Sequence, residues 1–314
     1  MQGPVGPIWM VQGKAVGRVL QRAQPSCSVL KDLMRDRPMT VSTITFTTDF
    51  GYADPYVGAM KGVALGINPD ALLVDVSHAV EPLDVVHGAF VLANFAPFFP
   101  TGTIHVVVVD PGVGTKRRAL AVQTEGQVFV LPDNGLLTFL LRDAGVLSRI
   151  AAETPFLDPV EVDVPDSWRV IQLTKEAFWR KPVSPTFHGR DIFTPVAAHI
   201  SNGVGLAELG EPIDRIVCLN IPVPGWDGDT IEGRIVRVDH FGNLVSTIPN
   251  ALVPPDVQVL VAGAIIHGLA PTFQAGVGLL ALKGSSGYVE IAISGGSAAG
   301  ALGAKVGDVV RAAR

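Results

Sequence analysis

The chain has 314 residues, of which 48% are hydrophobic and 17% are charged, and its net charge is −5. This composition supports a sizeable core and excludes a chain that is disordered throughout. The negative charge disfavours a nucleic-acid partner, and no apolar run reaches the roughly 20 residues that a membrane helix needs. Cys27 and Cys218 form neither a CxxC pair nor a metal-binding spacing. We therefore expect free thiols and a cytoplasmic location.

Residues 1–40 differ from the rest of the sequence, because they are basic and contain several glycines and prolines but no continuous apolar segment. A secretory signal peptide requires such an apolar segment, so we do not expect one. We expect a disordered leader, or a start codon assigned too early, with Met39 beginning the folded domain.

Strand and helix patterns alternate across residues 41–220. Expected strands lie in "TITFTTDFG", "ALLVDVS", "TIHVVVVD" and "RRALAVQT". Expected helices lie in "DPYVGAMKGVALGINP", with Asp54 as N-cap and Pro55 at its first position, in "DVVHGAFVLANFAPFFP" and in "HGRDIFTPVAAHISNG". This alternation predicts an N-terminal α/β domain with a largely parallel sheet.

The sequence changes character near residue 222, where proline and glycine are frequent. Six short β-rich segments follow at even spacing, with turn residues between them. This pattern indicates a smaller antiparallel β domain, a sandwich or a barrel. We therefore predict two domains, residues 41–220 and 221–314.

Three aspartates directly follow expected strands: Asp49 in "TTDFG", Asp110 in "VVDPG" and Asp133 in "LPDNG". An aspartate before glycine or proline often only stabilises a turn. However, ligands of α/β sheets bind at the carboxyl ends of the strands. Three such residues on successive strands therefore favour a shared site.

The segment "VVVVDPGVGTKRRALAVQ", residues 106–123, has glycines as a phosphate-binding loop does. A phosphate-binding loop opens a helix whose N-terminus contacts the phosphates, but here the following residues alternate like a strand. We expect instead that the glycines bend the chain so that Asp110 and Arg117 meet. Lys116 and Arg118 are expected to be solvated charges.

Two further segments contain candidate residues. In "TFHGRDIF", His188 is a candidate base near neutral pH, whereas Arg190 and Asp191 are expected to form a structural pair. The other histidines show no ligand spacing, so no metal site is expected. In the C-terminal domain, "DHFGN" and "GSSGYVEIAISGGSAAG" suit either hairpin turns or recognition of a flat polar ligand by Phe241, Asn243 and main-chain groups.

Seven motifs in this order resemble the S-adenosyl-L-methionine (SAM) hydrolase family, also called SAM hydroxide adenosyltransferases, which are relatives of fluorinating and chlorinating enzymes. The resemblance extends from about Thr43 to Arg311 and is carried by "TTDFG…DPYVGAMKG", "VDVSH", "DPGVGTKRR", "PDNGLL", "TFHGRDIF", "DHFGN" and "GYVEIAI…GSAA". It implies hydrolysis of SAM to adenosine and L-methionine by in-line attack of an activated water on C5′. It also implies a homotrimer with its substrate sites at subunit interfaces, and no cofactor, because SAM is the substrate.

The resemblance also assigns roles to single residues. It implies that Asp110, Arg117 and His188 activate the water. The substrate-binding residues that it implies are Asp49 for the ribose, Phe241 and Phe273 beside the adenine and ribose, Asn243 for the adenine, Asp239 and Ser285 for the methionine end, and Tyr288. Ser294 departs from the family, whose members often have asparagine there.

Two other functions are considered. The fluorinating relatives have hydroxyl side chains around the halide, a tyrosine at the position of Asp110, and a long insertion where this chain has only "TEGQ". Here the matching positions include Val113 and Gly189, which carry no hydroxyl, so hydrolysis is favoured over halide-dependent adenosyl transfer. A non-catalytic sensor of adenosine or SAM is the other alternative, but pure binding would not require a water-activating set.

Overall fold

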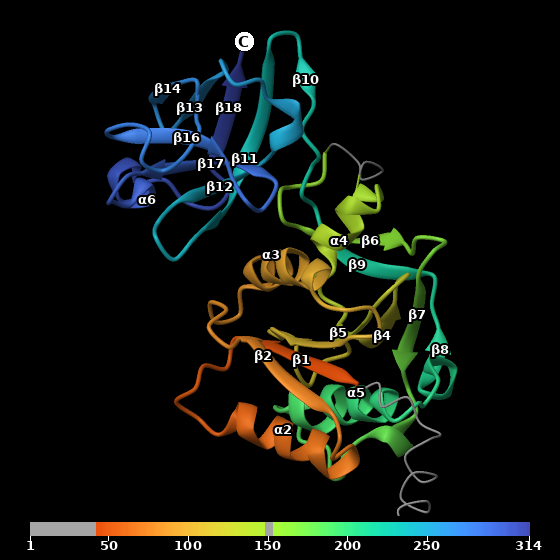
Figure 1. Ribbon diagram of the computed structural model, residues 1–314. Coiled ribbons are helices and arrows are strands. Elements are labelled where there is room, and N and C mark those ends of the chain that lie inside the picture. Colours follow the sequence, from red (N-terminus) through yellow and green to blue (C-terminus); the bar gives the residue numbers. More distant parts are fainter. Residues whose placement is uncertain (1–41, 148–152) are drawn as a thin grey trace, which may run out of the picture. The chain divides into compact units, whose positions relative to one another are not determined.

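The computed structural model describes residues 42–147 and 153–314 (Figure 1). The predictions for residues 1–40 and for Cys27 lie outside the described residues. The described residues belong to one compact unit that spans residues 41–314. The predicted boundary near residue 222 stays a prediction, although the sheets on its two sides are separate.

The N-terminal sheet has seven strands in the order β2-β1-β3-β5-β4-β7-β8. Neighbours from β2 to β5 pair in parallel, β4 is antiparallel to both β5 and β7, and β8 is antiparallel to β7. Five strands therefore share one direction, which confirms the largely parallel sheet. The strands are β1 Thr43–Thr48, β2 Leu72–Ser77, β3 Ile104–Val108, β4 Ala119–Gln123, β5 Val128–Pro132, β7 Arg169–Leu173 and β8 Gly210–Pro212. A separate two-stranded sheet pairs β6 Pro159–Asp163 with β9 Arg215–Leu219.

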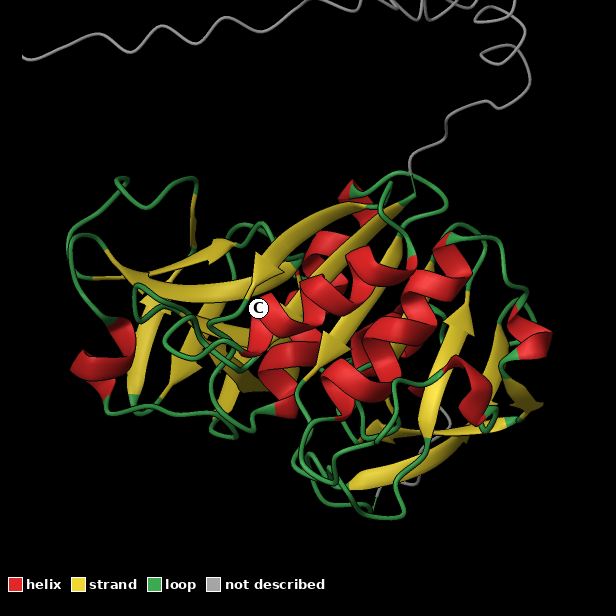
Figure 2. Cartoon of the chain, turned by 90° about the horizontal axis from the view of Figure 1, so that it is seen from below, coloured by secondary structure: helices red, strands yellow, loops and turns green. Residues whose placement is uncertain are grey.

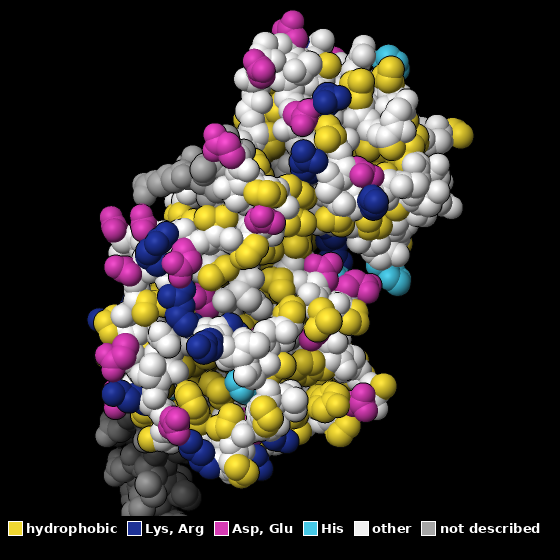
Figure 3. Space-filling view, turned by 180° about the vertical axis from the view of Figure 1, so that it is seen from behind, with side chains coloured by type: hydrophobic (Ala, Val, Ile, Leu, Met, Phe, Trp, Pro, Cys, Tyr) yellow, Lys and Arg dark blue, Asp and Glu magenta, His cyan; other side chains and the backbone are white. Residues whose placement is uncertain are grey.

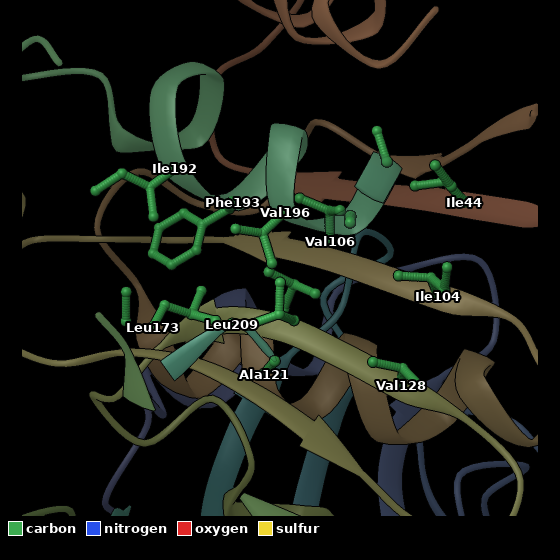
Figure 4. Close-up of a cluster of buried hydrophobic side chains, with 14 of the residues drawn as sticks. Ile44, Ile104, Val106, Ala121, Val128, Leu173, Ile192, Phe193, Val196 and Leu209 are labelled. Atoms are coloured by element: carbon green, nitrogen blue, oxygen red, sulfur yellow. The ribbon is translucent and has the colours of Figure 1, made fainter. Parts of the chain in front are cut away.

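Helices cover both faces of this sheet (Figures 1 and 2). The helices α2 Tyr56–Ile67 and α5 Thr194–Ser201 pack on one face, and α3 Val85–Phe95 and α4 Thr138–Asp143 on the other. Strand β3 shows why both faces are apolar: Val106 and Val108 join one core and Val107 and Val109 the other, since successive side chains of a strand point to opposite faces. Figure 4 shows the first core, to which Ile192, Phe193 and Val196 contribute together with Val106.

The helix ends differ from the sequence prediction at two places. Helix α2 begins at Tyr56 with Pro55 as N-cap and no side-chain cap, so the prediction of Asp54 as N-cap is wrong. The helix predicted at residues 188–203 is two elements, a π-helical segment at Gly189–Phe193 followed by α5. In contrast, Asp84 caps α3 by accepting a 2.9 Å hydrogen bond from the His87 amide.

The C-terminal region forms a nine-stranded, largely antiparallel sheet with a barrel-like order, β14-β13-β18-β11-β12-β17-β16-β15, to which β10 adds beside β11. This confirms the antiparallel β prediction, although β10, β14 and β15 were not predicted. The elements are β10 Trp226–Asp227, β11 Thr230–Val238, β12 Leu244–Pro249, β13 Gln258–Val261, β14 Ala264–His267, β15 Leu269–Ala270, β16 Leu279–Lys283, β17 Tyr288–Ile293, α6 Ala298–Leu302 and β18 Val309–Ala313.

Among the described residues, no helix is long and apolar enough to cross a membrane. The face of the molecule in Figure 3 shows Lys and Arg side chains interspersed with Asp and Glu rather than gathered in one basic patch.

Candidate active site

Strands β1, β3 and β5 are parallel neighbours, so their carboxyl ends meet at one edge of the sheet. Asp49, Asp110 and Asp133 follow these ends, as the sequence predicted. The three carboxylates nevertheless have different partners, and only Asp110 contacts the other predicted catalytic residues.

Arg117 holds the Asp110 carboxylate with two nitrogens. Its Nε donates to Oδ1 at 2.8 Å and to Oδ2 at 3.0 Å, and its Nη2 also donates to Oδ2. Both side chains are nearly buried, with exposed fractions of 10% for Arg117 and 5% for Asp110. A two-pronged ion pair of this kind fixes both position and orientation, because the guanidinium fork matches the carboxylate.

The loop between them depends on glycine. Gly114 has a φ of 75°, in the left-handed region, and a Cβ there would overlap the carbonyl oxygen of Pro185. This close approach brings the loop against the segment that carries His188. The chain then enters β4, which confirms the prediction that a strand and not a helix follows this loop.

Arg117 also reaches His188, since its Nη2 lies 2.8 Å from Nδ1 of the imidazole. A guanidinium has no acceptor, so Nδ1 must accept this hydrogen bond and the neutral ring carries its proton on Nε2. Burial of the ring and the charge of Arg117 lower the pKa of His188 below its usual 6.5. We call Asp110, Arg117 and His188 the triad; the structure brings all three together.

The turn after His188 is held by a buried ion pair. Asp191 accepts hydrogen bonds from Arg190 Nε at 2.7 Å, from Arg180 Nη1 at 3.1 Å and from the Ser184 amide at 2.8 Å. The structural pairing predicted for Arg190 and Asp191 is confirmed. It fixes the start of the π-helical segment and therefore the position of the imidazole.

The prediction that Arg118 is a solvated charge is wrong. Its Nε donates to Asp133 Oδ2 at 2.6 Å and its Nη2 to Glu161 Oε1 at 3.0 Å. Asp133 Oδ1 in turn accepts the Val217 amide at 2.8 Å. Asp133 therefore links β9 to the sheet edge and is not part of the triad.

Asp49 supports a neighbouring loop while keeping one oxygen free. Its Oδ2 accepts a 2.8 Å hydrogen bond from the Leu83 amide, and Leu83 has a left-handed φ of 65°. Within the described chain, Oδ1 of Asp49 has no hydrogen bond and so remains available to a ligand. The predicted contact of Asp49 with a ribose stays a prediction.

A pocket of about 710 Å³ lies in the C-terminal region, and we call it the C-terminal pocket. None of the triad residues lines it. It is lined by Asp239, Phe241, Asn243, Phe273, Gln274, Ser285, Glu290, Ile293, Ser294, Gly295 and Gly296. The structure therefore brings together most of the substrate-binding residues that the sequence predicted.

The turn between β11 and β12 is organised by Asp239. Its Oδ1 accepts the amides of Phe241 and Asn243, both at 2.8 Å, and its Oδ2 accepts Asn243 Nδ2 at 2.9 Å. The turn leaves the Phe241 ring 74% exposed, and the Phe273 ring is 46% exposed. Exposed rings beside a pocket are typical of surfaces that stack on flat ligands.

Tyr288 lies elsewhere. Its ring is 6.3 Å from the rings of Phe90 and Phe139, with the guanidinium carbon of Arg142 4.9 Å from its centroid. It lines a separate pocket of about 300 Å³. Its predicted role in substrate binding stays a prediction.

Sequence reasoning missed Gln274 and Glu290. Glu290 gave a signal, because it is the one acidic residue within the apolar strand sequence "YVEIAI". A charged residue inside a buried strand needs a partner or a function.

The family comparison agrees with this geometry. Residues 44–210 match the SAM hydroxide adenosyltransferase N-terminal domain, and residues 233–311 match the C-terminal domain of the same family.

Individual relatives agree with the family match. The chain is 37% identical over 281 residues to an (R)-S-adenosyl-L-methionine hydrolase of Salinispora tropica, covering 85% of this chain and 96% of the relative. A crystal structure of an uncharacterized conserved protein from Thermotoga maritima matches with a TM-score of 0.74 and 35% identity, covering 86% of this chain and 100% of that chain. A fluorinase of an Actinoplanes species is more distant, with 28% identity over 65% of this chain and 71% of the relative. The chain therefore belongs to the SAM hydroxide adenosyltransferase family.

Proposed function

We propose that this protein hydrolyses SAM to adenosine and L-methionine. The observation that carries the proposal is the joining of the Asp110 carboxylate and the His188 ring by one guanidinium, that of Arg117. The relatives named (R)-S-adenosyl-L-methionine hydrolase support the same reaction.

The reaction needs an oriented water more than an acid. Oxygen of water forms a bond to C5′ while the bond from C5′ to sulfur breaks, and sulfur keeps the electron pair as a neutral thioether. The water loses one proton, so SAM and water give adenosine, methionine and a proton. Because the leaving group is neutral, the site has to supply position and a proton acceptor. No cofactor is required by this chemistry.

The hydrogen bonds of the triad suggest how these roles divide. Nδ1 of His188 is occupied by Arg117, so Nε2–H is free to donate to the water oxygen and orient it. Oδ2 of Asp110 accepts two hydrogen bonds from Arg117, whereas Oδ1 accepts one and keeps a further lone pair, which accepts the proton. In this mechanism Asp110 is the base and His188 orients the nucleophile.

We further propose that the substrate lies between subunits of a homotrimer, with the C-terminal pocket of one chain facing the triad of the next. The separation of the triad from the residues that line this pocket supports the proposal. At SAM concentrations far below KM, where both variants have little activity alone, mixing Asp110→Asn subunits with Phe241→Ala subunits should then restore part of the activity. A mixture that stays at the sum of the two separate activities after subunit exchange contradicts a shared site. The buried free thiol of Cys218 supports a cytoplasmic location.

The function is tested by incubating the full chain with SAM in ¹⁸O-labelled water. We expect adenosine and methionine in equal amounts, with the label in the 5′-hydroxyl group of adenosine. Absence of adenosine contradicts the proposal. Binding of SAM without turnover would instead support a sensor.

Adding chloride or fluoride to the same assay tests the alternative reaction, halide-dependent adenosyl transfer. A Cβ at Gly189 would lie 3.3 Å from both Met60 Sδ and Phe50 Cε2, so an added hydroxyl would meet apolar, crowded surroundings. The β4–β5 connection is also a tight turn, closed by a 3.0 Å hydrogen bond from the Thr124 amide to the Gln127 carbonyl. We therefore expect chloride and fluoride to leave the products unchanged.

A further inference from the structure

A buried histidine outside the triad lies at the same edge of the N-terminal sheet. His78 directly follows β2, as Asp49 directly follows β1, and these two strands are parallel neighbours (Figure 1). The His78 side chain is fully buried, and the ring of Tyr52 packs edge-on to its imidazole with 5.1 Å between the ring centroids. A polar ring that is removed from water in this way needs hydrogen-bond partners within the protein.

His78 has a partner on each ring nitrogen. Nε2 lies 3.0 Å from Asp75 Oδ1, and Nδ1 lies 2.8 Å from Thr48 Oγ1. An ionised carboxylate only accepts hydrogen bonds, so Nε2 carries a proton and, in the neutral ring, Nδ1 accepts from the Thr48 hydroxyl group. The Thr48 oxygen in turn accepts a 3.2 Å hydrogen bond from the Phe50 amide. Every donor in this chain therefore points from Phe50 towards Asp75.

We call Asp75, His78 and Thr48 the relay. Its outer end is charged, because Lys61 Nζ of α2 donates to Asp75 Oδ2 at 2.6 Å. Although burial opposes it, the hydrogen bonds from Lys61 and His78 lower the pKa of Asp75. The relay is therefore anchored to an ionised carboxylate at neutral pH, and each hydrogen bond along it polarises the next.

The relay fixes the turn that carries Asp49. Its threonine accepts the Phe50 amide on one side of the turn, and the His78 carbonyl accepts the Gly51 amide at 2.8 Å on the other. The main chain at Asp49 is thus tied to the relay immediately before and after its side chain. The Asp49 oxygen that stays free within the described chain, Oδ1, therefore depends on the relay for its direction.

We propose that the relay positions this free Asp49 oxygen for the hydroxyl groups of a ribose. The inference rests on the proposed function, because SAM and adenosine both carry that ribose. A hydroxyl group donates to a carboxylate, and the hydrogen bond weakens steeply when donor, hydrogen and acceptor are out of line. His78 and Thr48 are therefore positioning residues, which act through Asp49 and not on the ligand itself.

The test compares two ligands that differ only in the ribose hydroxyl groups. Adenosine carries the 2′- and 3′-hydroxyl groups, and 2′,3′-dideoxyadenosine carries neither. By calorimetry, the wild type should bind adenosine about tenfold to a hundredfold more tightly, the range for a hydrogen bond to a charged group. Asp49→Ala should abolish this preference for adenosine.

Thr48→Val removes the hydroxyl group of the relay but keeps a branched side chain in the strand. It leaves Nδ1 of His78 and the Phe50 amide without their partner, so the turn loses its support. The affinity for adenosine should fall about fivefold to tenfold, and that for 2′,3′-dideoxyadenosine should change less than about twofold. Thr48→Ser retains the hydroxyl group and should keep most of the preference for adenosine.

Thr47→Val is the matched control. Thr47 is the neighbour of Thr48 on β1 and is equally buried, but its Oγ1 has no hydrogen bond among the described residues. The substitution should therefore change neither affinity. Equal losses in Thr47→Val and Thr48→Val would show that any change in this strand disturbs the site, which contradicts a role of the relay.

Asp75→Asn tests the outer end of the relay. Its amide oxygen can still accept from His78, but the negative charge is lost, so the preference for adenosine should fall by about threefold. Asp75 is partly exposed, so this variant answers the question if Thr48→Val does not fold. Thermal unfolding shows which variants are folded at the temperature of the binding measurement.

Each outcome decides one question. Equal weakening of both ligands in Thr48→Val, or unchanged binding of adenosine, overturns the role of the relay. Equal binding of the two ligands by the wild type overturns it as well, whether or not SAM is hydrolysed. If the wild type prefers adenosine but forms none from SAM, the proposed hydrolysis fails while the relay is judged by the binding data alone.

Discussion

The triad and the C-terminal pocket satisfy their polar groups in opposite ways. In the triad, Arg117 gives its donors to Asp110 and His188, so each group is held by the others before a ligand arrives. In the C-terminal pocket, Phe241 is mostly exposed and Glu290 has one long hydrogen bond. The first region is preorganised, and the second is completed by its ligand.

This difference separates chemistry from binding. Preorganised charges stabilise a transition state without reorganising during the reaction, so changes in the triad should lower kcat. Exposed rings and unused acceptors gain their partners when the ligand binds, so changes in the pocket should weaken affinity. If substitutions in the triad and in the C-terminal pocket change the same kinetic constant, this division between chemistry and binding is wrong.

The largest effect is expected for Asp110→Asn. The amide cannot accept the water's proton and loses the charge that pairs with Arg117, so kcat should fall by about 10³-fold, within the range of general base catalysis. Affinity for S-adenosyl-L-homocysteine should change less than about threefold, because the ligand contacts in the C-terminal pocket are intact. Single-turnover kinetics and calorimetry measure the two quantities.

Asp70→Asn is the matched control, since Asp70 is exposed and lies in the connection between α2 and β2. It should leave both quantities unchanged. A strong loss of affinity in Asp110→Asn, with kcat preserved, would place Asp110 in binding rather than in chemistry.

A smaller effect is expected for Phe241→Ala. Stacking of a base on an aromatic ring contributes about 1–3 kcal/mol, so the affinity for 5′-deoxy-5′-methylthioadenosine should fall about tenfold to a hundredfold. Because the ring is 74% exposed, thermal stability should barely change. Phe98→Ala, at a ring that is 87% exposed outside the pocket, should leave the affinity unchanged. Equal affinity losses in the two variants would rule out stacking at Phe241.

The regular part of the fold could be predicted from the sequence because its patterns are local. Apolar runs such as residues 104–109 have the length and composition of buried strands, and α3 has Asp84 at its start to cap it. The π-helical segment after His188 could not be predicted in this way. It depends on tertiary contacts, including the buried ion pairs of Asp191.

The candidate site shows the same limit. Motif resemblance brought Asp110, Arg117 and His188 together, but the sequence could not show that Nδ1 of His188 accepts from Arg117. The ion-pair partner of Arg118 could not be predicted either, because Asp133 is 15 residues away along the chain. The sequence analysis did not identify Glu290 as a pocket residue. The alternation of a strand predicts which face of the sheet a side chain occupies, but it does not predict whether that face lines a pocket.

The smallest effect concerns pH and depends on His188. Burial and the charge of Arg117 lower its pKa below 6.5, so the ring is neutral at pH 7 and becomes protonated only as the pH falls through that lowered value. Protonation places a hydrogen on Nδ1, where Arg117 already donates, and sets two positive charges side by side. The water-orienting arrangement is then lost, and kcat should fall about tenfold for each pH unit below that pKa.

Burial raises the pKa of Glu290, which lines the C-terminal pocket, and the two regions can be told apart by kinetic constant. The pH dependence of kcat reports groups in the substrate complex, and that of kcat/KM reports groups in the free enzyme. In Glu290→Gln, the acid limb of kcat should therefore be unchanged, because His188 is intact, while that of kcat/KM should become shallower. A kcat that does not fall with pH below neutrality would remove His188 from the chemistry. A kcat limb that vanishes in Glu290→Gln would instead show that the pocket and the triad act as one unit.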